Sequence, residues 1–394
     1  MPIVDRILVA RVMLGFVFVI SGSYHGATQT HEQMTPVLLQ VEDAPVPFVG
    51  TDGRTHLVYE LWMTNFSSGD AKVEKVEVLG DGKVIASLDA AAIAQRLQPA
   101  GKRNANDKLA ASEQALLFLH VTLPSGTAAP QRLSHRVSIH AEAAPPGQQE
   151  ITENGGTAVV NHRAVALISP PLRGEGYISA DSCCDATRHT RAAMPINGRV
   201  WIAQRYAVDW EQMDGQGRIY NGPREKLESY TIFGKPVLAV ADGMVVAVID
   251  GLPEQTPGKY PTNISLNEAD GNSVILDLGE QRYAMYAHMQ PGSIKVHKGE
   301  QVKVGHVIGL VGNTGNSLVP HLHFQVSAGP SSLASNGLPY EIRNFEVTGK
   351  TPGTKAFDEA EEKGTPLAVT PMKPVRQVTG ALPLDQLIIS FAGR

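Results

Sequence analysis

The sequence predicts a mainly β fold, in which an N-terminal β-sandwich-like domain is followed by a second β-rich domain. The first observation is period-two alternation of side chains, clearest where Leu57, Tyr59, Leu61 and Met63 alternate with other residues. The second is the abundance of turn formers, with 38 glycines and 26 prolines in 394 residues. Apolar residues make up 42% of the chain, which is enough for ordinary hydrophobic cores.

Charge and length narrow the classes of function. The formal net charge is −5, and no run of five or more Lys or Arg residues occurs. A nucleic-acid partner is therefore not expected. At roughly 150 residues per domain, 394 residues predict two or three domains.

The first 23 residues have the pattern of a secretory signal peptide. Arg6 and Arg11 precede an uninterrupted apolar run at residues 12–20, and Ser21 and Ser23 follow it at cleavage-site spacing. The run is too short to span a bilayer, which needs about 20 residues. We therefore expect cleavage after Ser23, export to the periplasm or the extracellular space, and no membrane span afterwards. An uncleaved anchor or a buried strand is the alternative.

Residues 24–50 are predicted to be a linker, and residues 51–170 the sandwich-like accessory domain. Its expected strands are short and separated by turn-rich stretches, at residues 56–64, 73–79, 116–123, 133–140 and 159–168, with one helix at 89–97. Five histidines lie in this region, but none has a spacing typical of metal ligands. We expect a binding or positioning module.

The segment Ser169-Pro170-Pro171 marks a boundary, after which a second domain is predicted over residues 171–345. Its expected strands again alternate with glycine-containing turns, at residues 236–240, 244–249, 273–278, 283–288, 306–311 and 321–326. Residues 346–394 are predicted to be a loosely patterned C-terminal tail. The apolar run at 384–391 is expected to be a last strand that docks onto one of the two domains.

The sharpest local signal for chemistry is the pair His321 and His323. On a strand, residues two apart face the same way, so both imidazoles project from one rigid element while Leu322 and Phe324 face a core. His288 ends another predicted strand. A His-x-His pair is a weak signal alone, and most such pairs have no ligand.

The second domain resembles the lysostaphin/LytM-type zinc endopeptidases. Six linked motifs over residues 195–330 agree with the family in order and approximate spacing: 234–243 (GKPVLAVADG), 271–274 (GNSV), 286–288 (YAH), 296–302 (VHKGEQV), 305–315 (GHVIGLVGNTG) and 321–323 (HLH). The resemblance implies an antiparallel β peptidase domain that cleaves peptide stems or cross-links of bacterial peptidoglycan.

Carried over by this resemblance, His323 and Asp209 would ligate one zinc ion. His288 and His321 would orient and deprotonate the attacking water or stabilise the oxyanion. The chemistry is reasonable in itself, because catalytic zinc usually has three protein ligands and an open position, and a neutral histidine moves protons well near pH 7.

One residue departs from the family pattern. Arg205 stands four residues before Asp209, where the family has a zinc-binding histidine. A guanidinium has no lone pair for a metal, so Arg205 could take the cation's place and pair with Asp209. Alternatively His189 supplies the third ligand, or Cys183 and Cys184 do through a thiolate.

The adjacent cysteines are otherwise read as two small buried residues, and a vicinal disulfide is a further alternative. Two stretches, 211–230 and 252–268, look like insertions that would wall or cover the site.

Three functions follow from these observations. The favoured one is an exported zinc endopeptidase acting on peptidoglycan or another cell-wall peptide. The second is a non-catalytic domain of the same fold that binds cell wall or regulates another hydrolase. The third is an adhesion or assembly protein that acts through residues 51–170.

Overall fold

The computed structural model describes residues 33–391, so the predicted signal peptide and the first part of the predicted linker lie outside the described residues. The chain divides between Thr35 and Pro36, and the description below concerns residues 36–391. No helix in this part of the chain is long and apolar enough to cross a membrane.

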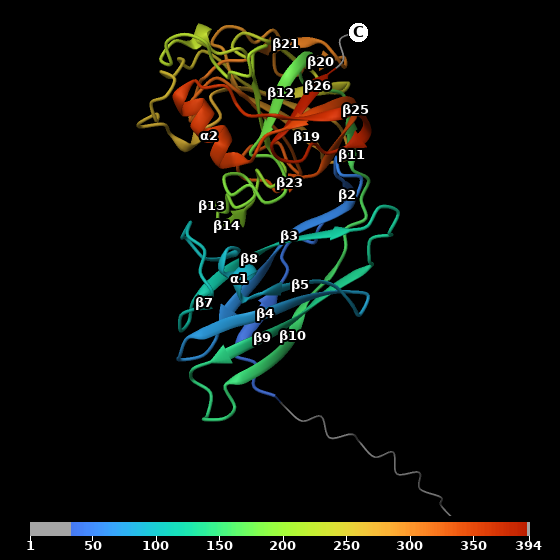
Figure 1. The fold of residues 1–394 in the computed structure, drawn as a ribbon, viewed down its shortest axis with the longest axis vertical. Helices are drawn as coiled ribbons and strands as arrows, with labels where there is room; N and C mark the ends of the chain where they lie inside the picture. Colours follow the sequence, from blue (N-terminus) through green and yellow to red (C-terminus); the bar gives the residue numbers. More distant parts are fainter. Residues whose placement is uncertain (1–32, 392–394) are drawn as a thin grey trace, which may run out of the picture. The chain divides into compact units, whose positions relative to one another are not determined.

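The first domain consists of two five-stranded antiparallel sheets (Figure 1). One sheet has the order β1-β3-β8-β6 with β2 beside β3, and contains β1 (Val37–Gln40), β2 (Phe48–Val49), β3 (Thr55–Asn65), β6 (Leu97–Pro99) and β8 (Gln114–Leu123). The other has the order β10-β9-β4-β5 with β7 beside β4, and contains β4 (Ala71–Gly80), β5 (Lys83–Asp89), β7 (Lys108–Leu109), β9 (Arg132–Ala141) and β10 (Glu150–Val159).

A short helix, α1 (Ala90–Ala94), connects β5 to β6. Asp89 caps the N-terminus of this helix, because its side chain accepts a hydrogen bond from the backbone N–H of Ala92 at 2.9 Å.

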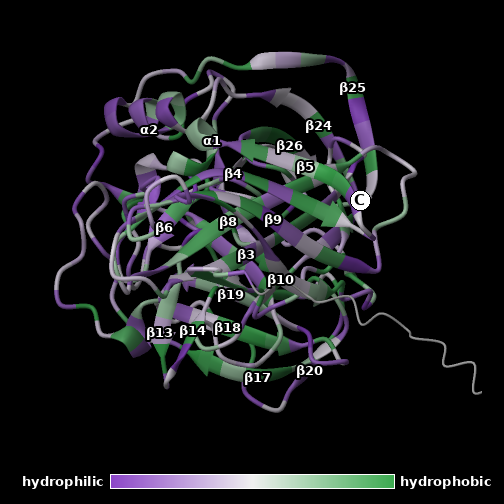
Figure 2. Ribbon diagram, turned by 90° about the horizontal axis from the view of Figure 1, so that it is seen from below, coloured by the Kyte–Doolittle hydropathy of each residue, from purple (hydrophilic) through white to green (hydrophobic). Residues whose placement is uncertain are grey.

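The two sheets share one hydrophobic core, as alternation predicts. Along β9, apolar and polar residues alternate in Figure 2. The buried cluster combines Tyr59 and Leu117 of one sheet with Val76 and Val137 of the other. This arrangement is consistent with the expected sandwich-like domain.

Two boundaries differ from the sequence-based expectations. Residues 37–49 do not form a linker, because β1 and β2 both pair with β3. The run at 159–168 is not one strand. β10 ends at Val159, and β11 (Ala166–Ile168) pairs with β24 (Tyr340–Lys350) of the second domain.

The second domain is built on a twelve-stranded sheet with the order β11-β24-β26-β12-β15-β22-β19-β18-β17-β20, to which β23 and β25 are added. Its further members are β12 (Gly174–Ala180), β15 (Val208–Gln212), β17 (Gly243–Ile249), β18 (Asn272–Asp277), β19 (Tyr283–Met289), β20 (Gln301–Val302), β22 (Leu322–Ser327), β23 (Gly337–Leu338), β24 (Tyr340–Lys350), β25 (Thr370–Ala381) and β26 (Leu387–Phe391). The pairing is antiparallel except between β11 and β24.

Smaller elements complete this domain. Two separate two-stranded antiparallel sheets pair β13 (Met194–Ile196) with β14 (Arg199–Trp201), and β16 (Pro236–Leu238) with β21 (Val307–Leu310). Two 3-10 turns, η1 (Leu227–Ser229) and η2 (Leu266–Glu268), lie in the two predicted insertions.

The C-terminal segment belongs to the second domain rather than forming a loose tail. β24 runs across the predicted boundary at residue 345, and α2 (Thr354–Lys363) and β25 follow it. β26 lies between β12 and β24, where Phe391 packs edge-on against Trp210 with ring centroids 5.1 Å apart. The predicted last strand is therefore central to the sheet.

Candidate metal centre and active site

Two neighbouring strands bring Asp209 and His323 together. Asp209 lies on β15 and is directly opposite His323 of β22 in the antiparallel register, so their side chains share one face of the sheet. The Nδ1 atom of His323 lies 2.8 Å from Oδ1 of Asp209. The sheet register thus places these two side chains next to each other.

His189 reaches the same place from the loop that follows β12. Ala180, the last residue of β12, is paired with Asp209, so the loop leaves the sheet beside the carboxylate. The Nδ1–H of His189 donates to the carbonyl oxygen of Asp181 at 2.9 Å, and its Nε2 lies 3.3 Å from Oδ2 of Asp209. One possible ligand atom from each of His189, Asp209 and His323 falls within 4.8 Å of the others.

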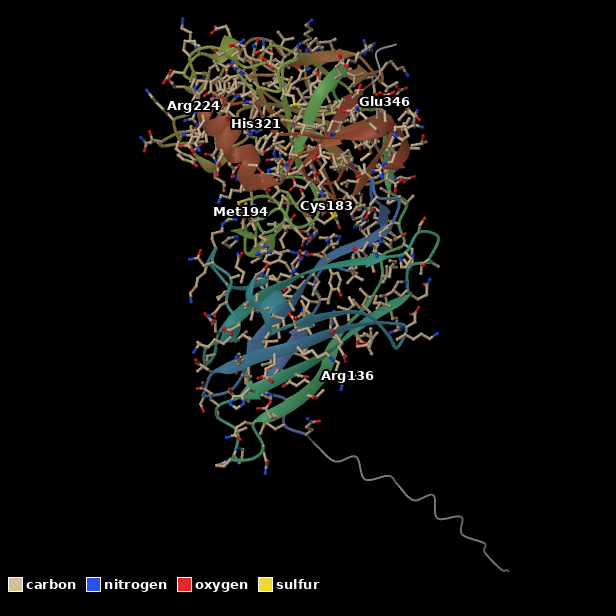
Figure 3. The ribbon with its side chains drawn as sticks, viewed as in Figure 1. Arg136, Cys183, Met194, Arg224, His321 and Glu346 are labelled. Atoms are coloured by element: carbon tan, nitrogen blue, oxygen red, sulfur yellow. A yellow bond between two sulfur atoms is a disulfide. The ribbon has the colours of Figure 1, made fainter. Side chains whose placement is uncertain are left out.

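His288 and His321 lie beside this group. Their rings are 4.7 Å apart, and Nε2 of His321 is 3.5 Å from Oδ1 of Asp209 (His321 is labelled in Figure 3). His288 has φ of 61°, a left-handed conformation that is rare outside glycine. Such conformations cost energy and concentrate at functional sites.

In each of His189, His288, His321 and His323, one ring nitrogen, here called the outer nitrogen, donates a hydrogen bond to an oxygen acceptor. His288 and His321 donate Nδ1–H to the carbonyl oxygens of Thr314 and Val319, at 2.7 and 2.9 Å. His323 donates Nε2–H to Oε1 of Gln325 at 3.0 Å.

The Gln325 amide is itself oriented, because its Nε2 donates to the Ser332 carbonyl at 2.9 Å. The inner nitrogens of His189 and His323 lie 3.3 and 2.8 Å from the Asp209 carboxylate. Because a carboxylate only accepts, each of these contacts needs a proton or a cation between the two atoms. A cation would take the place of these protons, and neutral imidazoles with an anchored second nitrogen are typical zinc ligands.

Burial and the neighbouring charges shift the pKa values of the residues in this group. Burial alone would lower the pKa of His189, but the Asp209 carboxylate outweighs it and raises that pKa to about 9. Burial would likewise raise the pKa of Asp209, but His189 and His321 hold it well below its usual value. Burial, with the charges of His321 and His323, lowers the pKa of His288 well below its usual value. His288 is therefore neutral near pH 7 and able to accept a proton.

The structure differs from the expectation for Arg205. Its guanidinium does not pair with Asp209; it makes a two-pronged ion pair with Glu60 of β3, with Nε–Oε1 3.0 Å and Nη2–Oε2 2.6 Å. Both side chains are buried, at 6% and 3% exposure. The sequence did not indicate this ion pair, because Glu60 lies in the first domain, 145 residues before Arg205.

Cys183 and Cys184 also differ from the thiolate alternative. They form a vicinal disulfide, and a sulfur bonded to sulfur has no thiolate to offer a metal.

Several residues that support the site were missed by sequence reasoning. Gln325 follows His323 by two positions and so shares its face of β22, a period-two signal that was available. The second predicted insertion does lie beside the site: Gln255 donates its N–H to the carbonyl of Asn313 at 2.8 Å, next to the Thr314 that holds His288.

Comparison with known proteins finds relatives of the second domain. Residues 230–335 match the model of peptidase family M23, a span that contains His288, His321 and His323. Lysostaphin of Staphylococcus simulans is 32% identical over 124 residues, which are 31% of this chain and 22% of that protein. Peptidoglycan DD-endopeptidase ShyA of Vibrio cholerae is 34% identical over 90 residues, covering 23% of this chain and 20% of that one.

The chain thus spans only about a fifth of the length of these two relatives. Among solved structures, the catalytic domain of lysostaphin from Staphylococcus simulans aligns at 23% identity, with 42% of this chain and 88% of that chain covered and a TM-score of 0.23. The resemblance to the LytM-type family is confirmed, and residues 230–335 of this mainly β chain carry a peptidase family M23 domain.

Proposed function

We propose that the protein is an exported zinc-dependent endopeptidase that hydrolyses peptide bonds in the stems or cross-links of peptidoglycan. The observation that carries the proposal is the convergence of His189, Asp209 and His323 within 4.8 Å, beside His288 and His321. Three ligands with an open position are typical of catalytic zinc.

In this proposal His189, Asp209 and His323 hold the zinc ion. When bound, zinc supplies Lewis-acid polarisation of the scissile carbonyl and lowers the pKa of a water molecule. His288, kept neutral by burial and anchored at Nδ1 by Thr314, accepts a proton at Nε2 and returns it to the leaving amine. His321, anchored by Val319, orients the reacting oxygen.

The substrate class is supported by the relatives. The Vibrio cholerae relative is a peptidoglycan DD-endopeptidase, and the signal-like pattern of residues 1–23 suits a substrate outside the cytoplasm. In the proposal, residues 36–160 act as an accessory domain that positions the peptidase.

The non-catalytic alternative relied on Arg205 as the partner of Asp209. Arg205 is instead neutralised by Glu60, and both non-ligand histidines remain beside Asp209. Among residues 33–391, no observation favours that alternative or an adhesion role.

The test is the zinc content and the activity of the oxidised full chain. We expect about one zinc per chain in wild type, and release of soluble peptide fragments from purified peptidoglycan. His189→Ala should lose both, whereas His297→Ala, whose side chain is 84% exposed in the same domain, should lose neither.

If the wild-type protein takes up no zinc after reconstitution, the proposed zinc-dependent activity is refuted. Zinc retained by His189→Ala would refute His189 as the third ligand.

A further inference from the structure

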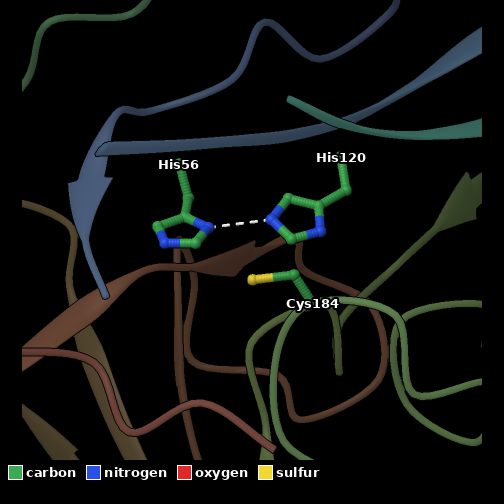
Figure 4. A group of neighbouring side chains, drawn as sticks. All are labelled: His56, His120 and Cys184. Carbon is green, nitrogen blue, oxygen red and sulfur yellow. Dashed lines mark hydrogen bonds between the residues drawn. The ribbon is translucent and has the colours of Figure 1, made fainter. Parts of the chain in front are cut away.

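A second cluster of side chains that could ligate a metal is present in the structure. His56 of β3, His120 of β8 and Cys184 of the loop after β12 meet with one possible ligand atom each within 4.8 Å of the others (Figure 4). The pairing of β3 with β8 places His56 opposite Thr122, two residues from His120, so the two histidines share a face. No residue is shared with His189, Asp209 and His323.

Each histidine of this cluster is held by a carboxylate on its outer side. Nε2 of His56 lies 2.9 Å from Oδ1 of Asp52, and Nδ1 of His120 lies 2.9 Å from Oδ2 of Asp185. A carboxylate accepts and does not donate, so these outer nitrogens carry the hydrogens. This is the arrangement that orients histidine ligands around metals and increases their basicity.

The inner nitrogens then face each other. Nδ1 of His56 and Nε2 of His120 are 2.8 Å apart (the dashed line in Figure 4). Two lone pairs at this distance need a shared proton or a metal cation between them. A tetrahedral zinc ion with bonds of 2.0–2.1 Å needs the two nitrogens about 0.5 Å further apart, a small rotation for two side chains.

Cys184 is the third member, and in this structure its sulfur is bonded to Cys183. Cys184 is 5% exposed and His56 2% exposed, so a charge placed between them is shielded from water. A buried thiolate beside two imidazoles favours zinc or another soft or borderline cation over calcium or magnesium.

We propose that reduction of the Cys183–Cys184 disulfide creates a second metal site, in which His56 Nδ1, His120 Nε2 and Cys184 Sγ bind a zinc-like cation. A dithiol supplies the two electrons and two protons: the Sγ–Sγ bond breaks, two thiols form, and the dithiol becomes a disulfide. The cation then replaces the thiol proton of Cys184 and the proton between the two imidazoles, and both protons leave to water.

The site ties two strands of the first domain to the loop that also carries His189, five residues after Cys184. The proposal does not rest on the proposed peptidase activity, because its ligands are separate from that centre.

The test uses Co²⁺ as the probe on the full chain. Only a thiolate ligand produces a near-ultraviolet sulfur-to-cobalt charge-transfer band, so Co²⁺ bound by His189, Asp209 and His323 is silent in this readout. The reductant is a phosphine, which is oxidised to the phosphine oxide and contributes no thiolate. We expect the band in reduced wild type, its absence in oxidised wild type, and its disappearance when Zn²⁺ is added.

Two single variants form a matched pair, because each removes the disulfide. Cys183→Ser leaves Cys184 without a partner and should show the band without any reductant. Cys184→Ser should show none. His120→Ala in the Cys183→Ser background should lose the band, and the exposed His140→Ala should keep it.

Absence of the band in Cys183→Ser, or an equal band in Cys184→Ser, would overturn the proposal. Neither result bears on zinc binding at His189, which is measured separately.

Discussion

Replacing Glu60 by glutamine would leave the Arg205 guanidinium buried without a counter-charge. The pair is 3% and 6% exposed, and both of its hydrogen bonds are charge-assisted. Burial by itself would lower the pKa of Arg205, but Glu60 raises it above its ordinary value, so the arginine stays charged. Glutamine keeps the shape of Glu60, removes its charge and replaces one of the two accepting oxygens by an NH2 group, which cannot accept from Arg205.

The magnitude follows from the desolvation of an unpaired ion. Breaking a buried ion pair by removing one partner typically costs about 3–5 kcal/mol. The expected loss for Glu60→Gln is in this range.

Asp242→Asn is the matched control, because Asp242 pairs with Lys303 at 2.7 Å with both side chains more than half exposed. It should cost less than about 1 kcal/mol. The double variant Glu60→Leu with Arg205→Met removes both charges and should recover most of the loss.

The assay is urea unfolding followed by tryptophan fluorescence, because Trp62 on β3 and Trp210 on β15 report on the strands near the pair. The free energies of unfolding of wild type, both single variants and the double variant are compared at one pH. The reasoning would be refuted if Glu60→Gln lost no more unfolding free energy than Asp242→Asn. It would also be refuted if the double variant Glu60→Leu with Arg205→Met were as unstable as Glu60→Gln.

Three further outcomes are expected. Burial raises the pKa of Glu153 to about 7, and its Oε2 has no hydrogen-bond partner among residues 33–391. An acid whose folded pKa is raised binds more protons when folded, so wild type should lose about 2–3 kcal/mol of unfolding free energy between pH 4.5 and pH 7. Glu153→Gln should flatten this slope in urea unfolding at pH 5 and pH 8, and an unchanged slope would contradict the assignment. Gln325→Ala frees the outer nitrogen of His323 and should weaken zinc binding about 10–100-fold in chelator competition; unchanged affinity would show that Gln325 does not orient the ligand. His321→Ala should keep its zinc while peptidoglycan hydrolysis falls about 10²–10⁴-fold, and loss of zinc instead would make His321 a ligand.

Local alternation predicted many of the strands well. The run at 133–140 became β9 (Arg132–Ala141), and the run at 116–123 became β8 (Gln114–Leu123). Period two is set by backbone geometry within one strand, so it can be read without knowledge of neighbours. The helix predicted at 89–97 is shorter in the structure, because α1 covers Ala90–Ala94 and Leu97 begins β6.

Predictions failed where pairing partners decide the structure. Residues 37–40 look like a linker by composition, yet they form β1 because β3 offers a free edge. Residues 166–168 continue an apolar run from the first domain, but they pair with β24, more than 170 residues later in the chain. The C-terminal run was recognised as a strand, while its place between β12 and β24 was not.

The sequence by itself determined which side chains are available for chemistry: His321 and His323 on one strand face, His288 at a strand end, Asp209 and His189 as candidate ligands, and a family resemblance based on six motifs. Only the tertiary structure decided which side chains are in contact. Asp209 of β15 lies opposite His323 of β22, and His189 contacts Asp209 from a loop. Arg205 forms its ion pair with Glu60 and not with Asp209. The tertiary structure also joined His56, His120 and Cys184, which spacing had not connected. The physical reason is that residue types and strand periodicity are local properties, whereas ion pairs and metal ligands depend on distances in space that are set by sheet register and by the packing of separate chain segments.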